Sequence, residues 1–98
     1  MGTLDGKVII ITGAARGQGE AEAELAAQAG AKVVVTDIID GESVAKKVNG
    51  LFIQHDVTSS EQWGKVVQRT LAQYGRIDGL VNNAGIWKPG GVTQATEA

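Results

Sequence analysis

The chain contains no cysteine, one proline, one histidine and only 4% aromatic residues. Without cysteine there is neither a disulfide nor a catalytic thiolate, so cysteine usage gives no indication of the redox compartment. A single histidine and no cysteine also argue against a zinc site. The net charge is −2 and the acidic and basic residues are interspersed, which argues against binding to nucleic acid or to an anionic membrane.

Long hydrophobic runs are missing as well. The run from Val8 to Ile11 is among the longest at four residues, far short of the ~20 that a transmembrane helix needs. It is also too short for the core of a signal peptide, so we expect no membrane segment and a cytoplasmic location. With 98 residues, of which 43% are hydrophobic and 20% charged, the chain has the composition of one small globular domain.

The sequence does contain an alternation of short apolar runs and helical stretches. Strands are predicted at residues 8–11, 33–35, 51–56 and 80–81, and helices at residues 18–28, 41–48 and 59–74, with a loop over residues 86–98. Such an alternation indicates a parallel sheet with right-handed crossovers. We therefore expect an α/β half Rossmann fold with strand order 3-2-1-4, three helices and a ligand crevice between strands one and four.

The predicted helices carry their own packing and end signals. In the first helix, Ala21, Leu25 and Ala29 are expected to face the sheet, and Gly30 suits a left-handed C-cap. In the third helix, Ser59 and Gln62 have capping-box spacing. Its apolar residues recur at helical intervals, and we expect the following to be core: Trp63, Val66, Val67, Thr70, Leu71 and Tyr74.

A glycine-rich segment, Thr12-Gly13-Ala14-Ala15-Arg16-Gly17-Gln18-Gly19, joins the first predicted strand to the first predicted helix. In this context glycines let the backbone approach a pyrophosphate, and the helix N-terminus offers unpaired N–H donors. We expect Gly13, Gly17 and Gly19 to bind phosphate in this way; the alternative is a tight turn without a ligand. A P-loop is disfavoured because no Gly-Lys-Ser/Thr follows the glycines.

Three further motifs follow the other predicted strands: Asp37, then Asp56 with Val57, then Asn83 with Ala84 and Gly85. The carboxyl ends of parallel strands meet at one edge of a sheet, so these motifs are expected to share a rim with the glycine turn. Asp37 lies 18 residues beyond Gly19, near the roughly 20 expected for a carboxylate that binds ribose. The alternatives are a solvated turn for Asp37 and a turn cap for Asp56.

These motifs resemble those of the short-chain dehydrogenases/reductases, and the resemblance covers essentially the whole chain. The family pattern Thr-Gly-x-x-x-Gly-x-Gly matches residues 12–19, and Asn-Asn-Ala-Gly matches residues 82–85. The resemblance, closest to the hydroxysteroid-dehydrogenase-like branch, implies that residues 1–98 are the dinucleotide-binding half of such an oxidoreductase, with NAD as cofactor. It implies these cofactor-binding residues: Gly13, Arg16, Gly17, Gln18, Gly19, Asp37, Asp56, Val57, Asn83, Ala84 and Gly85.

Some family features are absent or open to a second interpretation. The catalytic Tyr-x-x-x-Lys pair does not occur, because Tyr74 is the only tyrosine and no lysine follows it at that spacing; we expect no catalytic residue here. Gln18 replaces the bulky aliphatic residue that is usual in the family. Arg16 suits either a 2′-phosphate or the surface beside a pyrophosphate. Asn82 is expected to hold neighbouring strands, and His55 to be an ordinary strand residue.

Two functions from different classes follow: an NAD-binding half-domain that is inactive alone, or a truncated or engineered half-fold that mainly self-associates. Catalysis would need a complementing second half. A sheet that ends at strand four leaves an unpaired edge, and apolar residues such as Ile10 and Val81 would stay exposed on the face that only the third helix covers. We therefore expect a homodimer through the fourth strand and this face.

Overall fold

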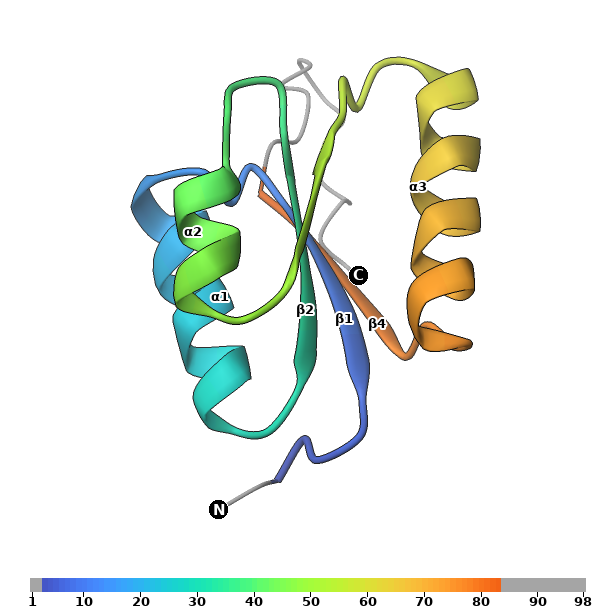
Figure 1. Cartoon of the computed structure of the whole chain (residues 1–98). Coiled ribbons are helices and arrows are strands. Elements are labelled where there is room, and N and C mark those ends of the chain that lie inside the picture. Colours follow the sequence, from blue (N-terminus) through green and yellow to red (C-terminus); the bar gives the residue numbers. More distant parts are fainter. Residues whose placement is uncertain (1–2, 84–98) are drawn as a thin grey trace, which may run out of the picture.

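In the computed structural model, which describes residues 3–83, a parallel sheet separates two layers of helices (Figure 1). The strands pair in the order β3-β2-β1-β4, and they are β1 (Val8–Thr12), β2 (Lys32–Asp37), β3 (Leu51–Gln54) and β4 (Gly79–Asn82). One face is covered by α1 (Gly17–Gln28) and α2 (Glu42–Lys47), the other by α3 (Ser60–Tyr74). The predicted half Rossmann fold and its strand order are confirmed.

β1 and β2 lie at the centre because their apolar residues are buried on both faces of the sheet. Alternate side chains of a strand point to opposite faces, so Ile10 and Val34 pack on the α3 side with Val66. Ile11 and Val35 join the core on the side of α1 and α2. This double burial explains the uninterrupted β-branched runs, which are typical of parallel strands.

The prediction for the inward side of α1 was wrong. Leu25 is 64% exposed, and the buried residues of the helix are Gly19 and Ala23. A Cβ on Gly19 would lie 2.1 Å from the Gly13 carbonyl oxygen, so this glycine must face the turn after β1. Once Gly19 faces inward, the ~100° rotation per residue brings Ala23 to the same side and carries Ala21 and Leu25 away from it.

α3 begins and ends as predicted. The Ser59 Oγ accepts a hydrogen bond from the Gln62 N–H at 3.1 Å, and Gly75 ends the helix in the left-handed region with φ 82°. Its inward side is narrower than expected, because Val66 and Thr70 are buried while Val67 and Leu71 are 39% and 45% exposed. The prediction that these last two residues belong to the core was wrong.

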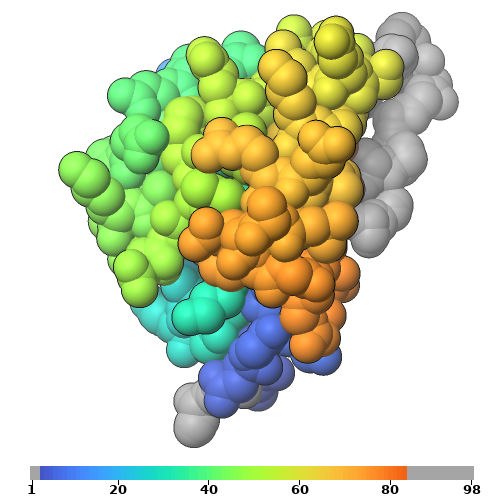
Figure 2. All heavy atoms as spheres, turned by 45° about the vertical axis from the view of Figure 1, so that its right-hand side comes forward, coloured from blue at the N-terminus to red at the C-terminus, as the bar shows by residue number. Residues whose placement is uncertain are grey.

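Figure 2 looks onto the side of the molecule that α3, coloured yellow to orange, covers. Ile10, expected to stay exposed here, is only 3% exposed because it packs between β2, β4 and Val66. Val81 is partly buried on the opposite face. The exposed apolar residue of β4 is Leu80, at 38%, so the expectation for this face was wrong for both Ile10 and Val81.

Side chains complete the junction between β1 and β4. The Asp78 carboxylate accepts from the Val8 N–H at 2.8 Å and pairs with the Arg76 guanidinium at 2.7 Å. These contacts hold the pKa of Asp78 at about 2, with Arg76 the main cause.

Across residues 3–83, no helix has the length and apolar character that a bilayer crossing requires.

Candidate functional site

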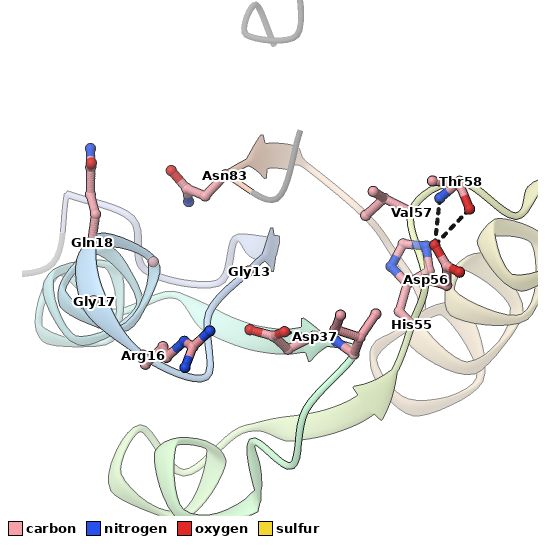
Figure 3. Close-up of a pocket in the computed structure, with 12 residues that line it drawn as sticks. Gly13, Arg16, Gly17, Gln18, Asp37, His55, Asp56, Val57, Thr58 and Asn83 are labelled. Carbon is pink, nitrogen blue, oxygen red and sulfur yellow. Dashed lines mark hydrogen bonds between the residues drawn. The ribbon is translucent and has the colours of Figure 1, made fainter. Parts of the chain in front are cut away.

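A pocket of about 610 Å³ lies at the carboxyl ends of the strands (Figure 3). Residues that follow all four strands line it: Gly13, Arg16, Gly17, Gln18, Gly19, Asp37, Ile38, His55, Asp56, Val57, Thr58 and Asn83. Every predicted site residue within the described range is therefore brought to one rim. Ala84 and Gly85, also predicted, lie outside the described residues.

The glycine turn forms one side of the pocket. Gly13 and Gly17 have φ of 62° and 64°, a region that residues with a Cβ rarely adopt. Arg16 is the N-cap of α1 and makes no capping hydrogen bond with its side chain. The first N–H groups of a helix have no partner within it, and together with the Arg16 guanidinium they make this turn suitable for an anion.

Asp37 lies between the glycine turn and the Asp56–Thr58 segment, with Arg16 beside it (Figure 3). One carboxylate oxygen accepts from the Ala15 N–H at 3.0 Å. The other accepts from the Ile38 N–H at 2.7 Å and the Ile39 N–H at 3.3 Å. Three backbone donors thus fix the carboxylate at the pocket, where it can accept hydrogen bonds from hydroxyls and repels a phosphate.

The segment after β3 forms the opposite wall. Asp56 Oδ1 accepts from the Thr58 N–H at 2.9 Å and from the Thr58 hydroxyl at 2.7 Å, and these two bonds lower the pKa of Asp56. Asp56 therefore does cap the turn before α3, as the alternative interpretation held. Its Oδ2 receives no hydrogen bond from the described residues, so one oxygen is left for a ligand.

His55 supports this wall from beneath. β3 ends at Gln54, but the His55 N–H still donates to the Asp37 carbonyl at 2.9 Å. His55 is 1% exposed, its Nδ1 lies 3.2 Å from Thr36 Oγ1, and its ring meets the Trp63 ring edge-on, with 4.2 Å between the ring centroids. Burial lowers the pKa of His55 and so favours the neutral ring.

Two asparagines follow along β4 and differ in role. The Thr12 hydroxyl donates to Asn82 Oδ1 at 2.8 Å, so Asn82 joins β1 to β4 as predicted. Asn83 lines the pocket and donates through Nδ2 to Glu22 Oε1 at 2.6 Å. The other oxygen of Glu22 accepts from Gln18 Nε2 at 3.3 Å.

Three pocket-lining residues were not among the predicted site residues: Ile38, His55 and Thr58. Ile38 and Thr58 lie directly beside predicted ones, so extending each strand-end motif by one residue would have found both. Ile38 is 61% exposed, which puts a large apolar side chain at the mouth of the pocket. Glu22 does not line the pocket, but it contacts Asn83, which does. No motif in the sequence indicates this contact, because the two residues are 61 positions apart.

Comparison with known proteins gives one consistent family. The model of the short chain dehydrogenase family matches residues 7–98. A trans-4-hydroxycyclohexanecarboxylate dehydrogenase from Sinomonas cyclohexanicum is 39% identical, over 91% of this chain and 39% of its own length. Tropinone reductase-like 2 from Erythroxylum coca is 47% identical, over 85% of this chain and 32% of its own.

Among solved structures, the chain is similar to the 3-ketoacyl-(acyl-carrier-protein) reductase from Brucella melitensis, crystallised in complex with NADH. The TM-score is 0.78 and the sequence identity 36%, over 81% of this chain and 34% of the reductase. The chain thus spans between about a third and two fifths of the length of these relatives.

Proposed function

Because this chain belongs to the short-chain dehydrogenase family, we propose that residues 1–98 form a dinucleotide-binding half-domain for NAD. The observation that carries the proposal is the Asp37 carboxylate, which three backbone N–H groups hold at the pocket beside the glycine turn. The complex of the Brucella reductase with NADH supports the same class of cofactor.

The strand order suggests how NAD would lie. Adenine would lie at Asp56 and Val57 after β3, against the exposed side chain of Ile38. Its ribose would lie at Asp37 after β2, and the pyrophosphate would contact the turn after β1, through Gly13, Arg16, Gly17, Gln18 and Gly19. The second ribose would reach the segment after β4. This segment begins with Asn83, and Ala84 and Gly85, which match the family pattern, come next in the sequence. The order β3-β2-β1-β4 thus matches the order of groups along the ligand.

The fixed carboxylate favours NAD over NADP. Asp37 would accept hydrogen bonds from the ribose hydroxyls of NAD and repel the 2′-phosphate of NADP. Hydrogen bonds to a charged group contribute about 1.5–3 kcal/mol, which corresponds to a preference of roughly tenfold or more. Arg16 would not reverse it, because Asp37 is the group aimed at the ribose.

Calorimetric titration of the chain with NAD and NADP tests the proposal. We expect tighter binding of NAD, and a preference reduced by about tenfold in Asp37→Ala. Asp40→Ala is the matched control, because among residues 3–83 the Asp40 carboxylate accepts only the Glu42 N–H, at 2.9 Å, and it does not line the pocket. Tighter binding of NADP by the unaltered chain would contradict the assignment.

We further propose that the chain alone turns over no substrate. The Tyr-x-x-x-Lys pair that supplies the positioned proton donor in the family is not in this sequence, and proton transfer requires a group within hydrogen-bonding reach. The contacts left to the chain are those of the first half of the fold, so we expect weak binding. Sustained NADH formation with alcohol or steroid substrates by the purified chain would refute this proposal.

Self-association is a second candidate function, favoured by an apolar surface that we define as Val67, Leu71 and Leu80. They are 39%, 45% and 38% exposed, and Leu80 pairs with Ile10 of the α3 face. We propose that two copies pair through β4 and this surface. Light scattering over a dilution series should detect a dimer that Leu71→Lys dissociates; a 10.1 kDa species at micromolar concentration would contradict it.

A further inference from the structure

Glu22 links two of the segments that line the pocket without lining it itself. It lies on α1, one turn beyond Gln18, and both of its carboxylate oxygens accept a hydrogen bond. Oε2 accepts from Gln18 Nε2 at 3.3 Å, and Oε1 accepts from Asn83 Nδ2 at 2.6 Å. Gln18 and Asn83 both line the pocket, so Glu22 contacts residues of the glycine turn and of the segment after β4.

The charge on Glu22 determines which way the Asn83 amide faces. An ionised carboxylate only accepts hydrogen bonds, whereas a carboxamide has a donor end and an acceptor end. Asn83 must therefore turn its NH₂ group toward Glu22. Its Oδ1 receives no hydrogen bond from residues 3–83, so the acceptor end is the one available to a bound molecule. Figure 3 shows the amide directed from the end of β4 toward the side of α1.

This orientation gives the pocket two chemically different ends. At Arg16 and Gly17, the guanidinium and the start of α1 favour an anion. At Asn83, an acceptor oxygen with a carboxylate behind it favours a hydroxyl and disfavours a phosphate. β1 lies between β2 and β4, so a nucleotide that runs from Asp37 across the glycine turn reaches Asn83 after its pyrophosphate.

We infer that Glu22 is a positioning residue, which presents the Asn83 amide oxygen to a hydroxyl of the ribose beyond the pyrophosphate. The inference rests on the proposed function, because it assumes that a dinucleotide occupies the pocket. It adds a residue that lies outside the glycine and Asn-Asn-Ala-Gly motifs. It also assigns Asn83 a hydrogen-bond acceptor role that the sequence alone left open.

ADP and ADP-ribose are the probes, because they differ by that ribose. We expect the unaltered chain to bind ADP-ribose more tightly than ADP in calorimetric titrations. In Glu22→Gln, the new amide can donate to Asn83 Oδ1 and let the Asn83 amide turn over. The preference for ADP-ribose should then fall by about three- to tenfold, while the Kd for ADP changes less than twofold. Asn83→Ala should lose the same preference, and the double variant should lose no more.

Glu24→Gln is the matched control. Glu24 lies on the same helix, but its carboxylate pairs with Lys47 at 3.3 Å and it does not line the pocket. Its ADP-ribose to ADP ratio should equal that of the unaltered chain. A Glu22→Gln ratio within twofold of the unaltered chain, or an equal loss for both probes, would overturn the inference and leave the proposed function intact. Failure of the unaltered chain to bind ADP at all would instead refute the proposed function.

Discussion

Gly19→Ala tests the close approach of α1 to the turn after β1. An added Cβ would lie 2.1 Å from the Gly13 carbonyl oxygen, 2.7 Å from the Gly13 carbonyl carbon and 2.9 Å from the Ala14 Cα. All three atoms belong to the backbone, so no side chain can rotate to make room. Because ordinary contact begins near 3.4 Å, the first turn of α1 must move outward by more than an ångström.

The magnitude follows from two opposing contributions. Overpacking against a rigid neighbour costs about 3 kcal/mol, the upper end of the usual range. Replacing glycine by alanine within a helix returns about 1 kcal/mol. The net loss in the free energy of unfolding is therefore about 2 kcal/mol, which lowers the Tm by roughly 8–16 °C in a domain of this size. Nucleotide affinity should fall as well, because the displaced turn is the proposed pyrophosphate site.

Urea and thermal unfolding followed by circular dichroism would measure the change. Gly64→Ala is the matched control: Gly64 lies within α3, and its added Cβ would meet nothing within 4 Å. That variant should gain about 1 kcal/mol and retain nucleotide binding. A Gly19→Ala chain as stable as the unaltered one would refute the close-approach argument.

Three further variants test side-chain contacts by unfolding measurements. Asp78 contributes stability above its usual pKa of 3.8 that is lost as the pH falls toward the folded pKa of about 2; Asp78→Asn should remove this dependence, and an unchanged acid profile would contradict it. Burial lowers the pKa of His55 below 6.5, so its contribution to the free energy of unfolding is present above pH 6.5 and is lost as the pH falls below that value. His55→Gln should reduce this pH dependence of the free energy of unfolding. If the pH dependence persisted in the variant, another group would be its cause. Ser59→Ala removes the N-cap of α3 and should lower the free energy of unfolding by about 1 kcal/mol; no loss would show that the cap contributes nothing.

The order and type of the elements could be predicted because local signals agreed with the global pattern. β-Branched runs mark strands that are buried on both faces, and the cap of α3 needs only Ser59 and Gln62, three residues apart. The inward side of α1 could not be found in this way. Leu25 is more apolar than glycine, so the sequence pattern places it toward the sheet. In the structure the close approach of Gly19 to the turn after β1 sets the rotation of the helix, and Leu25 is exposed. Such an approach depends on tertiary contact.

The candidate site likewise has some features that the sequence predicts and others that depend on tertiary contacts. Its strand-end motifs were predictable because parallel strands bring their carboxyl ends to one rim. The Ala15 donor to Asp37 and the buried pairing of His55 with Thr36 were not, because each depends on the register between strands. The other two donors to Asp37, the Ile38 and Ile39 N–H groups, belong to the turn that directly follows it. The cytoplasmic location and the homodimer stay predictions.

Trp63 gives this chain an optical probe of its own pocket. Its indole N–H donates to the Val57 carbonyl at 2.9 Å, and its ring meets His55 at 4.2 Å, so it lies directly behind the wall proposed for adenine. The sequence contains one other tryptophan, Trp87, and Trp87→Phe would leave Trp63 as the single tryptophan. A nucleobase placed against Val57 would change the emission of Trp63, and an imidazolium at His55 would quench it. Ligand occupancy and histidine protonation thus become separable in one fluorescence titration, without any added label.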